Sequence, residues 1–146
     1  MATSKIGVVR AALKTAIAAK LSGVNVFAFP PGEAALVGVS AHEFVALARA
    51  EGTQSHLVFG GTREEDIVVS GVLYAAKSGS GDTVFTTAED RALVLLAGVE
   101  DALTSDDTPG ANTFHGQVTN YRVDHGSDGD RSWCAIEFDI EVESHI

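Results

Sequence analysis

The C-terminal stretch "RSWCAIEFDIEVESHI" (Arg131–Ile146) alternates apolar and acidic residues more strictly than the rest of the chain. Successive side chains of a β-strand point to opposite faces, so this alternation predicts a strand with one buried face. The apolar positions are Cys134, Ile136, Phe138, Ile140 and Val142. The opposite positions are Ala135, Glu137, Asp139, Glu141 and Glu143. We therefore expect a sheet that turns one face of this strand towards the core.

Working back along the chain, two more strands are predicted. The segment 114–123, "FHGQVTNYRV", leads through "DHGSDGD" (Asp124–Asp130) into the C-terminal strand, which indicates a long hairpin. The segment "EEDIVVSGVLYAA" (Glu64–Ala76) is apolar or small on both faces after Asp66, as expected of a central strand. The preceding "HLVFGG" (His56–Gly61) is interpreted as its neighbour, joined to it by a tight turn.

Helical spacing predicts two main helices and one shorter one. The first begins at a capping Ser4 and runs to about Leu21. The second begins at a capping box, Thr86–Glu89, and runs to about Leu103. The spacing of Phe44, Leu47 and Ala48 predicts a third, Ala41–Gly52. The apolar faces are Ile6, Val9, Leu13, Ile17 and Leu21 in the first helix, and Leu93, Leu96, Val99 and Leu103 in the second. Short strands are expected at Val24–Phe29 and Glu33–Ser40.

Length and composition narrow the functional classes. The 146 residues suit one domain spanning 1–146, and 20 acids against 10 bases give a net charge of −10. Such a chain repels phosphates, so we do not expect it to bind nucleic acid by charge. Cys134 is the only cysteine, which excludes an intrachain disulfide and a four-cysteine zinc site. Neither a signal peptide nor a membrane span is evident, so we expect a soluble protein.

The motifs that most resemble reactive sites are better explained as turns. Gly60-Gly61 lacks the spacing and the lysine of a phosphate-binding loop. The acids of Glu64–Asp66 alternate between strand faces, and the local sequence ties no histidine or nucleophile to them. The acids of Asp124–Asp130 miss the calcium-loop register, and the five histidines lack metal-binding spacing. We predict no catalytic residue, cofactor or metal site, and a buried, inert Cys134.

Two features remain open to more than one interpretation. The acidic row Glu137, Asp139, Glu141 and Glu143 is typical of a solvated outer face, but it also suits a surface that meets a basic partner or repels a polyanion. Trp133, among these acids, is either an interface anchor or an ordinary half-buried side chain.

The chain resembles the tail terminator (tail-completion) proteins of long-tailed bacteriophages. The matching pieces are "FGGTREEDIVVSGVLYAA", "SGSGDTVFTTAEDRALVLLAGVEDALTSDDTPG" and "RSWCAIEFDIEVESHI". With the first helix they cover most of the chain, although they are patterns of turn and period rather than invariant chemistry. The predicted elements and this resemblance together imply an α+β fold: a twisted, mostly antiparallel sheet, two main helices packed on one face, and a long C-terminal β-hairpin.

The resemblance also implies a function based on interfaces. Such proteins form a ring, commonly of six copies, that caps the tail tube, stops its polymerisation and meets the head-side connector. We thus expect a virion protein, assembled in the host cytoplasm, with itself, the tail tube protein and the connector protein as partners. Alternatives are another neck or tail subunit, or a small cytoplasmic α/β ligand-binding domain or enzyme.

A closed ring needs two different complementary patches on each copy. The candidate interface residues are Arg63, Glu64, Glu65 and Asp66, expected at a hairpin tip, and Trp133, expected near a sheet edge. DNA must pass through the ring without specific binding, and an acidic lining would repel its phosphates. Glu137 and Asp139 are the candidates for that lining.

Overall fold

The computed structural model describes residues 4–30, 43–54, 64–104, 115–127 and 130–145. The elements in these ranges are α1 (Ile6–Lys20), β1 (Asn25–Phe27), β2 (Glu43–Gln54), β3 (Glu64–Ser78), α3 (Asp82–Thr104), β4 (His115–Ser127) and β5 (Arg131–His145). The strands form one sheet in the order β1-β2-β3-β5-β4, antiparallel throughout except for the parallel pair β1–β2. The predicted strands Glu33–Ser40 and His56–Gly61 lie outside the described residues.

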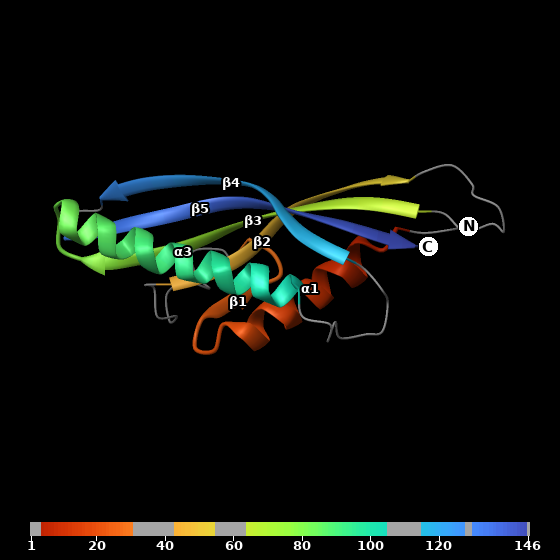
Figure 1. Ribbon diagram of the computed structural model, residues 1–146, viewed down its shortest axis with the longest axis horizontal. Coiled ribbons are helices and arrows are strands. Elements are labelled where there is room, and N and C mark those ends of the chain that lie inside the picture. Colours follow the sequence, from red (N-terminus) through yellow and green to blue (C-terminus); the bar gives the residue numbers. More distant parts are fainter. Residues whose placement is uncertain (1–3, 31–42, 55–63, 105–114, 128–129, 146) are drawn as a thin grey trace.

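Both helices pack against the same face of the twisted sheet, called the helix face below (Figure 1). The predicted α+β fold is confirmed, with its two main helices on one side and the long β4–β5 hairpin at the C-terminal end. β3 lies in the middle of the sheet, as its two apolar faces predict. No described helix covers the opposite face, called the open face.

The core lies between the sheet and the helices, and the alternation of β5 determines which side chains enter it. Its apolar positions are all buried, as predicted: Cys134, Ile136, Phe138, Ile140 and Val142. β3 contributes Ile67, Val69, Leu73 and Ala75 to the same layer. Burial of these apolar side chains is the main source of folding free energy, at about 25 cal/mol per Å².

The first helix forms where it was predicted, but its cap differs. Lys5, not Ser4, is the N-cap and makes no side-chain capping bond, while the Ser4 hydroxyl accepts a hydrogen bond from the Ile6 backbone N–H at 3.1 Å. The predicted apolar face is buried at Val9, Leu13, Ile17 and Leu21, while Ile6 is half-buried. Arg10 is also buried; its guanidinium donates to the Ala28 carbonyl at 2.8 Å and lies over the Phe29 ring. Arg10 therefore connects α1 to the segment after β1.

The helix predicted over Ala41–Gly52 is wrong, because residues 43–54 form β2. Its first half alternates, with Val45 and Leu47 on the helix face and Phe44 stacked on the opposite side. A bulge then shifts the pairing with β3 between Leu47 and Ala50. The spacing of Phe44, Leu47 and Ala48 imitates a helix because both faces of this strand carry apolar side chains, Phe44 and Ala48 on one face and Leu47 on the other.

The predicted capping box at Thr86–Glu89 is also wrong. α3 begins four residues earlier, at Asp82, directly after Gly79 and Gly81, whose positive φ angles turn the chain out of β3. The Thr86 hydroxyl instead donates to the Asp82 carbonyl at 2.8 Å inside the helix. The buried face of α3 is Ala88, Ala92, Leu95, Leu96, Val99 and Ala102. Leu93, predicted to face the core, is 40% exposed.

Candidate functional site: the open face of the sheet

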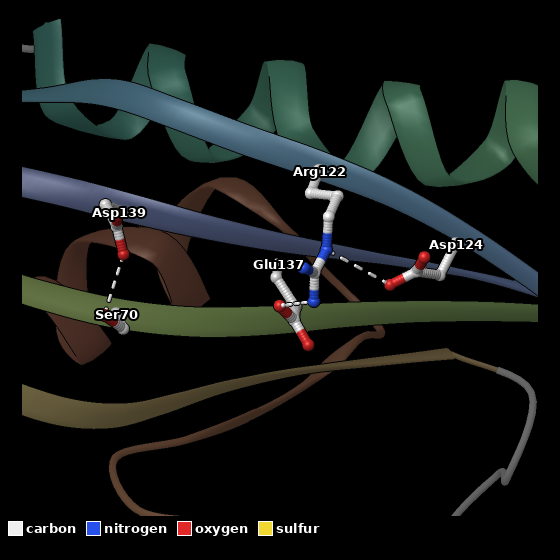
Figure 2. A network of polar contacts seen from close by, with 5 residues as sticks. All are labelled: Ser70, Arg122, Asp124, Glu137 and Asp139. Carbon is white, nitrogen blue, oxygen red and sulfur yellow. Dashed lines mark hydrogen bonds and ion pairs between the residues drawn. The ribbon is translucent and has the colours of Figure 1, made fainter.

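The open face carries the acidic side of β5 and the side chains paired with it. Directly paired residues of neighbouring strands share a face, so Glu137 lies beside Arg122 of β4, and Asp139 beside Ser70 of β3. Figure 2 shows these polar side chains standing off the strands, with the helices behind the sheet. The acidic row is exposed apart from the half-buried Asp139. The row therefore lies on the exposed side of the sheet, as each of its three interpretations requires.

Arg122 is the centre of a small polar network on this face (Figure 2). Its Nη2 lies 2.6 Å from Glu137 Oε2, and its Nε lies 3.5 Å from Asp124 Oδ2. The Ser70 hydroxyl donates to Asp139 Oδ1 at 2.7 Å. The Arg122 side chain is 70% exposed, so each pair contributes at most about 1 kcal/mol. The network orders the surface and leaves its charges accessible to a partner.

An open hollow of about 440 Å³ lies beside this network. Its lining includes Ala48, Ser70, Val72, Arg122, Glu137 and Asp139. Reactive sites combine a nucleophile or an acid with a base within hydrogen-bond reach, whereas here the acids are engaged with Arg122 and Ser70. Within the described ranges, no cluster of three or more His, Cys, Asp or Glu side chains is placed to hold a metal ion.

The end of the open face near the C-terminus is more strongly acidic. Asp66, Glu141 and Glu143, together with Gln117, border a second hollow of about 310 Å³. The three carboxylates are exposed, and none forms an ion pair with another residue in the part of the chain that the structure describes. This group of three carboxylates is called the acidic end below.

Aromatic rings cross the other end of the open face. The Phe44 and Tyr74 rings stack at 5.3 Å between centroids, and Trp133 follows at 6.0 Å from Tyr74. Phe27 continues the row at 6.3 Å from Phe44, so the rings span β1, β2, β3 and β5. On β4 the row meets Gly126, where a Cβ would collide with the Trp133 ring. Trp133 is half-buried by these contacts.

Several predicted site residues take positions that the sequence did not reveal. Glu65 and Asp66 lie inside β3 and not at a hairpin tip, and Glu64 is the first residue of that strand. Glu65 is 1% exposed, because its side chain turns inward to the start of α1. Trp133 is on β5, between β3 and β4, so it does not lie at a sheet edge. Arg63 lies outside the described residues.

Sequence reasoning missed four side chains of the open face: Phe44, Ser70, Tyr74 and Arg122. The signal that identifies them is strand register. Once β3 is paired with β5, Ser70 falls opposite Asp139 and Tyr74 opposite Ala135. Phe44 was hidden by the incorrect helix at Ala41–Gly52.

Cys134 and His125 lie away from the open-face network. Burial, followed by the negative charges of Glu89 and Asp124, raises the pKa of the Cys134 thiol to about 11. A buried neutral thiol is a poor nucleophile, which agrees with the predicted inert role. His125 Nε2 lies 2.8 Å from Glu89 Oε2 and joins β4 to α3. Neither described helix has the length and apolar content needed to cross a membrane.

Comparison with known proteins gives a structural likeness. No protein-family model and no curated protein sequence matches the chain. Its structure is similar to that of a chain described as "Virion of native gene transfer agent (GTA) particle", with a TM-score of 0.53 and 19% sequence identity. The alignment covers 98% of this chain and 100% of that one. The likeness, at this identity, shows that the two chains share a fold over their whole lengths.

Proposed function

We propose that this chain is a structural virion protein of a tailed bacteriophage or a related particle. It acts as a tail terminator: a homo-oligomeric ring, most simply a hexamer, caps the tail tube, stops its polymerisation and joins the tail to the head-side connector. Each copy contributes one domain of 146 residues. The ring works through surfaces, without a catalytic residue, cofactor or metal ion.

The observation that carries this proposal is the fold likeness over the complete length of both chains. The other chain is described as part of a virion particle, and the alignment covers 98% of this chain and 100% of that one. The sequence patterns that resemble tail terminators support the finer role. The open face supports it too, because exposed charges on an interface steer encounter and select the partner.

The acidic open face also supports a role at the DNA channel. Glu137 and Asp139 are proposed to line the bore, where their charge keeps the passing DNA from adhering. The net charge of −10 acts in the same direction. Trp133 and Asp66 are proposed as interface residues. Glu65 would act indirectly, because it is buried and holds α1 in place.

A tube-assembly experiment tests the terminator role. Purified tail tube protein from the same genome is allowed to polymerise with and without this protein, and tube lengths are measured by negative-stain electron microscopy. A terminator shortens the tubes and sits at one end of each. Tubes of unchanged length with bare ends would contradict the proposal.

The same experiment separates the terminator from another neck or tail subunit, a distinction that the likeness to a chain of a virion particle does not make. A tube subunit polymerises into long rods by itself, whereas a terminator stops at a ring or a short stack. A head–tail connector binds heads and leaves tube growth unchanged.

A further inference from the structure

The chain separates its charges along the sequence and in space. Residues 1–32 hold four of the ten bases and none of the 20 acids. Two of these bases, Lys14 and Lys20, are exposed on α1, and neither forms an ion pair with another described residue. The acidic end, in contrast, gathers Asp66, Glu141 and Glu143 on the open face.

These two surfaces point in opposite directions. α1 buries one side against the helix face of the sheet, so its outer side faces away from the sheet, whereas the acidic end lies on the open face behind it (Figure 1). The outer side of α1 is exposed at Val8, Ala11, Lys14, Thr15 and Ala18. Four of these five side chains are small, and such a helix surface can approach a sheet closely.

We propose that the acidic end of one copy binds the outer side of α1 of a second copy. In this contact Lys14 enters the hollow bordered by Asp66, Glu141 and Glu143. In this contact a helix of one copy packs on the sheet of another, just as the helices of each copy pack on their own sheet. This proposal rests on the proposed ring. The outer side of α1 and the acidic end are the two different patches that each copy in such a ring needs.

Charge favours this pairing over the two symmetric pairings, in which open face meets open face or α1 meets α1. Two open faces placed together would bring six carboxylates of the two acidic ends into one contact, and two α1 helices would bring lysines together. Like charges in a contact suppress the wrong pairing. The remaining arrangement joins α1 of one copy to the acidic end of the next. This contact is heterologous, so it closes into a ring when the rotation between copies allows and otherwise grows as a filament.

Charge reversal tests the contact. Lys14→Glu alone and Glu141→Lys alone should each weaken self-association about 100-fold, measured by sedimentation at low salt. The double variant should recover part of the loss, because one pair is rebuilt with the charges exchanged while Asp66 and Glu143 keep their charge. The matched controls are Lys77→Glu on β3 and Asp90→Lys on α3, which should leave self-association unchanged. Additive losses in the double variant would overturn the proposal.

Cross-linking tests the same contact directly. In a Cys134→Ala background, a short bismaleimide should join Lys14→Cys of one copy to Glu141→Cys of the next. The doubly substituted chain should give a ladder that ends at the ring number, whereas each single cysteine variant can reach only dimers. A product limited to dimers, or no more product than the single variants give, would overturn the proposal. The same result is expected if a basic partner protein, and not a second copy of this chain, binds the acidic end.

The proposed function and this contact can fail separately. Wild-type rings that cap tubes while the charge reversals have no effect would refute the contact alone. A complete ladder from a protein that leaves tube growth unchanged would refute the terminator role alone.

Discussion

The Glu65 carboxylate accepts a hydrogen bond from the backbone N–H of Lys5 at 2.8 Å, across 60 positions of the sequence. Lys5 precedes the first turn of α1, where backbone N–H groups lack partners within the helix. A negative charge at this end also interacts favourably with the helix dipole. The buried Glu65 thus ties α1 to β3.

Replacing this carboxylate should therefore be costly. Glu65→Ala should lower the free energy of unfolding by about 2–3 kcal/mol, because it removes a charged, buried hydrogen bond and leaves a cavity. Urea denaturation followed by circular dichroism measures the change. Glu100→Ala, an exposed acid on α3, is the control and should change stability by less than about 0.5 kcal/mol. Equal losses in the two variants would show that Glu65 does not anchor α1.

The close approach of Trp133 to Gly126 makes a second prediction. Gly126→Ala should push the indole ring off β4, because a Cβ there collides with the ring. The expected cost is about 1–3 kcal/mol of stability. Trp133 is the only tryptophan, so its fluorescence reports the movement directly, and the emission should shift to longer wavelength. An unchanged spectrum would mean that the ring does not cover β4.

Gly7 and Gly23 should respond to alanine in opposite ways. Gly7 lies in α1 with open space around its missing Cβ, so Gly7→Ala should stabilise the protein by about 0.5–1 kcal/mol through helix propensity. Gly23 has a φ of +83°, a left-handed conformation, so Gly23→Ala should destabilise it by about 1 kcal/mol. Midpoints of thermal unfolding measure both. The same sign in both variants would contradict the described end of α1.

Cys134 should make the free energy of unfolding fall as the pH rises through the alkaline range. Its pKa in the folded protein is raised from 9.0 to about 11, so the folded state holds the thiol proton after the unfolded state has released it. The stability that this provides is fully present below pH 9 and is lost as the pH rises towards 11. The loss amounts to about 2–3 kcal/mol. Cys134→Ala should lack this component when the two unfolding free energies are compared between pH 8 and pH 11. Parallel pH profiles would show that the thiol does not titrate late.

An element could be predicted from the sequence where the spacing of its apolar residues follows which of its faces are buried and which are exposed. β5 alternates because one face is buried and the other is open, and α1 shows a single apolar stripe because it covers one side of a sheet. The capping box failed because Thr86 can serve a helix start as well as its interior, and the turn at Gly79 and Gly81 determined the start.

Other features depend on pairing between distant segments, which a single sequence does not display. The acids Glu64–Asp66 were predicted at an exposed tip, yet the Glu65 side chain turns inward and accepts a hydrogen bond from the backbone N–H of Lys5, 60 residues away. β2 was predicted as a helix because both of its faces carry apolar side chains, Phe44 on the open face and Leu47 on the helix face. The aromatic row became visible only when register brought Phe44, Tyr74 and Trp133 together.

We propose that copies of this chain form a closed ring at the head-side end of the tail. Electron cryomicroscopy of particles produced by the genome that encodes the chain tests it most directly. We expect density for this fold as a single ring of identical copies between the tube and the connector, with Glu137 and Asp139 towards the channel. Particles in which the chain is absent, or in which its fold occupies another position, would contradict it.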